Sequence, residues 1–176
     1  MESPITWTHR RKTDILNTYF ILGANGNTPK WWDFNLHELY CAGHFYEAAV
    51  AHYRATNGQD TRLFDMAIKN ADYVCSLFGE GKWKQVPGHQ EIELALVKLA
   101  NLCNEIGGEY AEKAQNYITL AEFFLDTRGD YEGRHGTNHN NQYDQDHLPV
   151  AEQREAVGHA VRAGYDVYCH ADINLL

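Results

Sequence analysis

Apolar side chains recur along this chain at steps of three and four residues, which is the period of a helix with one buried face. Almost no stretch alternates with the two-residue period of a strand. Glycine-rich turns such as Thr56-Asn57-Gly58 and Gly107-Gly108 separate the periodic stretches. The pattern predicts an all-α fold with helices over residues 34–55, 60–78, 89–106, 110–125 and 149–170.

The predicted helices repeat in pairs. A nearly apolar helix, a glycine turn, an amphipathic helix and a glycine stop occur twice, offset by roughly 50 residues, which is typical of a helical-hairpin array. The hairpins cover residues 34–78 and 87–125, and the last helix would open a third. We therefore expect a single domain over residues 1–176, with an irregular lead-in over about 1–32, hairpins over 33–170 and a long polar loop over 129–146.

Composition narrows the classes of function. The chain has 176 residues and a formal net charge of -9, and it has no stripe of Lys and Arg, so we expect no nucleic-acid partner. No apolar run is long enough to span a membrane, and the N-terminal residues lack the apolar core of a signal peptide. The compartment is not fixed by these residues, and the cytoplasm is the default. The four cysteines lie far apart and fit reduced, packed thiols.

Histidines gather near the starts of the predicted helices. Neutral imidazole, amide and carboxylate groups at such positions suit a polyhydroxylated ligand better than phosphate or DNA. The candidate ligand-binding residues are His37, His44, His89, His147 and His159.

Other interpretations of these residues stay open. His37, Cys41 and His44 share one helix face, so zinc or copper ligation is an alternative, as is packing in the core. His159 is explained equally well as a core residue whose ring nitrogens are hydrogen-bonded and as a ligand contact. Arg162 is expected to form a rim ion pair with Glu155 or Asp166.

Glycoside hydrolysis needs a pair of carboxyl groups flanking the scissile bond. Three glutamates lie near the helix starts that carry the histidines: Glu38, Glu91 and Glu152. Their positions in the sequence do not show which two of them would face each other across a bound sugar.

Several segments together resemble glycoside hydrolase family 127, the β-L-arabinofuranosidases. The resemblance runs from Leu16 onward, through His37-Glu38-Leu39-Tyr40-Cys41-Ala42-Gly43-His44, Val86-Pro87-Gly88-His89-Gln90-Glu91, Phe123-Phe124-Leu125-Asp126-Thr127-Arg128-Gly129, Asp146-His147-Leu148-Pro149 and Ala156-Val157-Gly158-His159.

The resemblance implies helical hairpins of an (α/α)6-type barrel, here an incomplete toroid, with a sugar pocket at the ends of the inner helices. It also implies release of L-arabinofuranose from glycans. The pocket histidines of the family would fall on His44 (or His37), His89, and His159 (or His147).

The family's zinc-held cysteine nucleophile and its glutamate acid/base have no counterpart that we identify in this sequence. The chain resembles roughly the N-terminal half of the catalytic helical domain. We therefore assign it no catalytic residue, no metal ligand and no cofactor, although zinc is implied for a complete member. We expect a glycosidase-like domain that is inactive alone, an L-arabinofuranoside as ligand, and self-association that covers exposed inner-helix faces. The alternative is a helical-repeat module that binds a peptide or protein.

Overall fold

The computed structural model describes residues 30–136 and 142–174, and within them the chain is helical. The elements in order are η1 (Phe34–Leu36), α3 (Glu38–Ala55), α4 (Arg62–Leu77), α5 (Ile92–Ile106), α6 (Glu109–Asp126), η2 (Val150–Glu152) and α7 (Ala160–Asn174). The predicted all-α class is confirmed. Nearly all of the predicted lead-in and residues 137–141 of the predicted loop lie outside the described residues.

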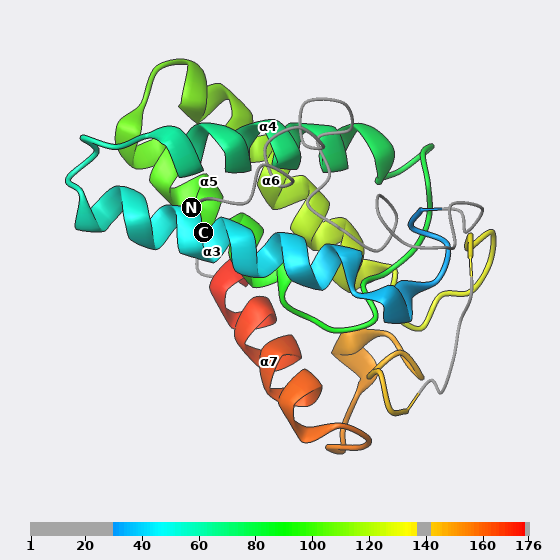
Figure 1. Cartoon of the computed structure of the whole chain (residues 1–176). Coiled ribbons are helices and arrows are strands. Elements are labelled where there is room, and N and C mark those ends of the chain that lie inside the picture. Colours follow the sequence, from blue (N-terminus) through cyan, green and yellow to red (C-terminus); the bar gives the residue numbers. More distant parts are fainter. Residues whose placement is uncertain (1–29, 137–141, 175–176) are drawn as a thin grey trace, which may run out of the picture.

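Helix α5 is the centre of the structure, and it packs against α3, α6 and α7 (Figure 1). Its sequence explains this position, because apolar residues occur on nearly every face of the helix, and such a helix is stable only when it is surrounded. Helix α4 lies outside and packs on α3 and α6. It turns one stripe inward, formed by Phe64, Ala67, Ile68, Ala71 and Val74.

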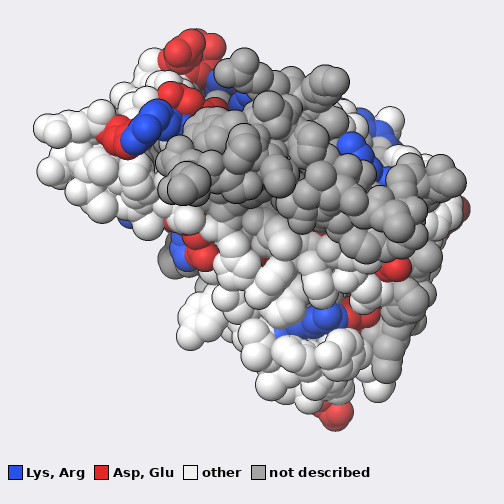
Figure 2. Space-filling model, viewed as in Figure 1, with Lys and Arg blue, Asp and Glu red and all other residues white. Residues whose placement is uncertain are grey.

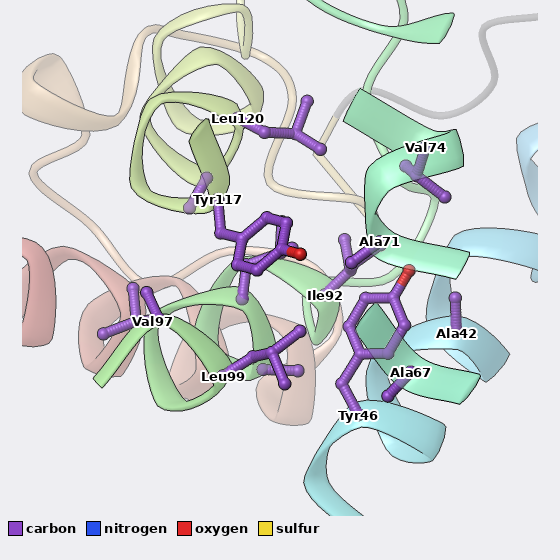
Figure 3. Close-up of a cluster of buried hydrophobic side chains, with 14 of the residues drawn as sticks. Ala42, Tyr46, Ala67, Ala71, Val74, Ile92, Val97, Leu99, Tyr117 and Leu120 are labelled. Carbon is purple, nitrogen blue, oxygen red and sulfur yellow. The ribbon is translucent and has the colours of Figure 1, made fainter. Parts of the chain in front are cut away.

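Side chains from α3, α4, α5 and α6 meet in one core (Figure 3). Two tyrosines in it are fully buried, and each hydroxyl has a partner on α4. The hydroxyl of Tyr46 donates to Oδ1 of Asn70 at 2.8 Å, and that of Tyr117 donates to Oδ1 of Asp72 at 2.7 Å. The core therefore holds two aromatic rings without leaving their polar ends unpaired.

A glycine sets how closely α3 approaches the start of α5. A Cβ atom on Gly43 would lie 2.7 Å from Cγ of Glu91 and 2.9 Å from Cα and N of Ile92. Any side chain there would collide with backbone, which cannot rotate away. Gly43 thus allows the two helices to bring their side chains together at this end.

Two predicted helix starts were wrong. The last helix begins at Ala160, not at Pro149, and Pro149 precedes only the single 3-10 turn η2. The residues between η2 and α7 are not helical, and Gly158 among them has a left-handed φ of +67°; a Cβ atom there would lie 2.0 Å from the carbonyl oxygen of Gln142. Helix α5 begins at Ile92 rather than near His89, because Glu91 has an extended φ of -174°.

No helix among residues 30–136 and 142–174 is long and apolar enough to cross a membrane. On the face shown in Figure 2, basic and acidic side chains lie close to one another, and the coloured residues form no continuous basic area.

Candidate functional site

Histidine and tyrosine rings from three helix starts lie against one another. Tyr40 of α3 lies 4.7 Å from His89, centroid to centroid, and 4.4 Å from His44. His89 lies 6.0 Å from His159 and 5.6 Å from Tyr165 of α7. We call the whole set the ring cluster; its members are His37, Tyr40, His44, His89, Tyr143, His159 and Tyr165.

The cluster brings together four of the five predicted histidines. His147 is the fifth, and it is not in ring contact with the others in the part of the chain that the structure describes. Tyr40, Tyr143 and Tyr165 were missed from sequence. Tyr40 sits inside the first motif and could have been found there, whereas Tyr143 and Tyr165 carry no signal in their local sequence.

Local backbone geometry holds the imidazoles in place. His37, at the N-cap of α3, has a φ of +59°, a left-handed conformation that costs free energy in any residue with a Cβ. Nδ1 of His89 lies 2.7 Å from the carbonyl oxygen of Gln90. The backbone N–H of His159 donates to the carbonyl of Tyr143 at 3.3 Å, and this bond ties α7 to the preceding loop.

The imidazoles of His37 and His89 are biased toward the neutral form. Burial is the main cause that lowers the pKa of each, and the Arg162 guanidinium lowers both further. A neutral imidazole offers one donor and one acceptor. In His89 the donor is used by Nδ1 on the Gln90 carbonyl, so Nε2 is left to accept a hydrogen bond from a hydroxyl group.

Beside the rings lies a pair of carboxyl groups. Oε1 of Glu91, which is fully buried, lies 3.0 Å from Nδ1 of His44. Burial, followed by the neighbouring Glu47 carboxylate, raises the pKa of Glu91 to about 8. Burial also acts to raise the pKa of Glu47, but the hydrogen bonds from Lys98 and Glu91 and the charge of Lys98 together outweigh it and leave that pKa lowered. One carboxyl group of the pair therefore keeps its proton while the other is ionised.

His44, Glu47 and Glu91 are also close enough to share a metal ion, because their ligand atoms lie within 4.8 Å of one another. Lys98, however, already contacts Glu47 and supplies the positive charge there. Of the metal set considered from sequence, only His44 belongs to this group, and Cys41 is exposed to solvent.

The expected role of Arg162 was wrong. Its side chain is buried, pairs with Asp144, and lies over the ring of Tyr143, with Cζ 4.6 Å from the ring centroid. Sequence spacing suggested partners on the same helix, but the loop before α7 folds back and brings Asp144 to it.

The family profile of the β-L-arabinofuranosidase GH127 catalytic domain matches residues 10–173 of this chain. The chain belongs to glycoside hydrolase family 127. A non-reducing end β-L-arabinofuranosidase of Bifidobacterium longum subsp. longum is 37% identical over 146 residues, which cover 73% of this chain and 20% of that protein.

Two solved GH127 enzymes share the fold of the chain. The crystal structure of a β-L-arabinofuranosidase from Geobacillus stearothermophilus T6 superposes with a TM-score of 0.74 at 39% identity, covering 91% of this chain and 26% of the enzyme. A second GH127 β-arabinofuranosidase gives 0.69 at 44% identity, covering 84% and 21%. The chain thus spans about a quarter or less of the length of these relatives. Membership of the family does not favour the alternative of a peptide-binding module.

The zinc implied for a complete GH127 enzyme is held largely by thiolates. Among the described residues, the group able to hold a metal contains no cysteine, and a lysine competes for one of its carboxylates. This group of one histidine and two glutamates does not conflict with a zinc ion, although it is not the thiolate set that the resemblance implies.

Proposed function

We propose that the ring cluster forms part of the pocket that holds a non-reducing-end β-L-arabinofuranose residue. The observation that carries this proposal is the meeting of imidazole and phenol groups from α3, the turn before α5, and α7 within ring-contact distance. A furanose presents hydroxyl groups around a small apolar ring. Neutral imidazoles and phenols bind the hydroxyls, and aromatic faces pack on the C–H groups.

The proposed role of each residue follows from its position in the ring cluster. His89 is central, because it contacts rings from both α3 and α7, and His159 closes the side formed by α7. His44 and His37 flank Tyr40 on the side of α3. The carboxyl group of Glu91 is fully buried and contacts Nδ1 of His44, so it supports that ring and does not reach the sugar itself. His147 stays a predicted contact that the described geometry does not test.

In a complete enzyme, we propose that this pocket part orients the sugar while nucleophile and acid/base are supplied by other residues. The chain on its own is then a binding unit. Incubation with an aryl β-L-arabinofuranoside should give no turnover, and turnover that His89→Ala abolishes would show that the chemistry lies in this chain.

Calorimetric titration with methyl β-L-arabinofuranoside tests the proposal directly, because the glycoside locks the furanose form. We expect binding that His89→Ala and His159→Ala each weaken by on the order of tenfold or more. His52→Ala is the matched control, since His52 also belongs to α3 but faces Asp60 at 3.7 Å instead of the cluster. Equal affinity in all four proteins, or no binding by the unaltered chain, would contradict the proposal.

Self-association also stays a prediction. Helix α7 exposes apolar surface at Val161, Val167 and Tyr168, which supports it. Sedimentation should show a dimer or larger species, and a monomer at high concentration would count against it.

A further inference from the structure

Arg128, which follows α6, has a side chain that is 0% exposed and contacts four separate places in the structure. Its Nη2 donates to the carbonyl of Pro87 at 3.0 Å and to Oε1 of Glu93 at 3.2 Å. Its Nη1 donates to the carbonyl of Asp144 at 3.2 Å, and its Nε lies 3.5 Å from Oδ1 of Asp166.

Each of these partners is a near neighbour in sequence of a residue in the site. Pro87 lies two residues before His89, and Asp144 follows Tyr143 directly. On the helices, Asp166 of α7 follows Tyr165 directly. Glu93 of α5 lies two residues after Glu91, the carboxyl group that contacts His44. Through two backbone carbonyls and two carboxylates, one guanidinium therefore joins the three segments that carry the central and α7-side rings.

We propose that Arg128 is a positioning residue that fixes the spacing of His89, Tyr143 and the α7 rings, and so the shape of the sugar pocket. The proposal rests on the function proposed above. Arg128 does not belong to the ring cluster, and it acts through the segments that it joins.

The chemistry of the guanidinium suits this task. It is planar and carries five N–H donors that point in different directions, so it can satisfy acceptors on several segments at once. A lysine ammonium has the same charge but only one nitrogen, and it cannot span the same acceptors. A buried ion pair is a weak source of net stability, because removing the charges from water offsets most of their attraction. Fixing the relative position of three segments is a better physical reason for burying a charge here.

The test compares Arg128→Lys and Arg128→Met with Arg134→Lys in the full chain. Arg134 is the control, because its side chain is also buried and ion-paired, but its partners, Asp146 and the Thr127 carbonyl, are not among the four groups that Arg128 contacts. The first readout is the NMR signals of the His89 and His159 ring protons without sugar. The second is the affinity for methyl β-L-arabinofuranoside.

We expect both Arg128 variants to shift the His89 and His159 signals and to weaken sugar binding by on the order of tenfold or more, because small misplacements of binding groups are costly. Arg134→Lys should change neither readout. A folded Arg128→Lys protein with unshifted ring signals would overturn the proposal.

If both Arg128 variants fail to fold, Asp166→Ala is read in the same way, because it removes the carboxylate that contacts Nε and keeps the guanidinium. Unshifted ring signals in that variant would also overturn the proposal. If the unaltered chain shows no response to the sugar, the proposed function fails. The ring signals still decide the role of Arg128, so the two failures are distinguishable.

Discussion

Replacing Gly43 with alanine tests whether the close approach of α3 to α5 builds the site. The added Cβ would lie 2.7 Å from Cγ of Glu91 and 2.9 Å from two backbone atoms of Ile92. Carbon atoms prefer to be about 3.5–4.0 Å apart, so the helices must separate by about 1 Å. That shift also stretches the 3.0 Å contact between His44 and Glu91.

The expected magnitude follows from two opposing effects. Alanine is favoured over glycine inside a helix by about 1 kcal/mol. Overpacking a well-filled interior costs about 1–3 kcal/mol, and the upper part of that range applies here because backbone atoms are involved. The free energy of unfolding should therefore fall by about 1–2 kcal/mol, which lowers Tm by about 2–8 °C in a domain of this size.

Urea and thermal unfolding measure the effect, with Gly164→Ala as the matched control. Gly164 also lies inside a helix, α7, but its added Cβ would meet no atom within 4 Å. That variant should be stabilised by about 0.5–1 kcal/mol. If Gly43→Ala is stabilised as much as Gly164→Ala, the close approach of the two helices is not what we describe.

Two further predictions concern buried polar groups. Tyr46→Phe removes the hydroxyl that donates to Asn70, and should lower the free energy of unfolding by about 1–2 kcal/mol in urea titrations; an unchanged value would refute this reasoning. The pKa of Glu91 is raised from 4.5 to about 8, so between these values the folded chain keeps a proton that the unfolded chain has lost. This carboxyl group therefore makes stability fall as pH rises, by at most about 1.4 kcal/mol per pH unit. Glu91→Gln should flatten that slope in urea unfolding at several pH values, and parallel slopes would contradict the raised pKa.

Much of the helical fold follows from local patterns in the sequence. The periods of three and four residues predicted α3, α4, α5 and α6 to within a few residues, because the buried stripe of a helix must repeat at that spacing. Helix α7 was misjudged at its start. Pro149 and Glu152 are signals of a helical first turn, and one turn is what they form. That turn ends at Glu152 because Gln153 is extended, and the left-handed Gly158 lies in the non-helical stretch before α7.

The site was predictable only where its residues share a helix or a helix start. His37, His44 and Tyr40 lie on one turn or the next of α3, so their proximity follows from helix geometry. Their contacts with residues of the loop and α7 depend on tertiary folding. Arg128 lies in one of the segments that carry the family resemblance, but its role could not be predicted, because the four groups that it contacts are brought together only in the folded chain.

The central claim is that the ring cluster, with rings from α3, the turn before α5 and α7, binds one arabinofuranose residue. Intermolecular nuclear Overhauser effects between methyl β-L-arabinofuranoside and the histidine ring protons test it most directly. The account predicts contacts from the same sugar to both His89 and His159, and none to His52. Contacts to only one of the two rings, or to histidines outside the ring cluster, would contradict it.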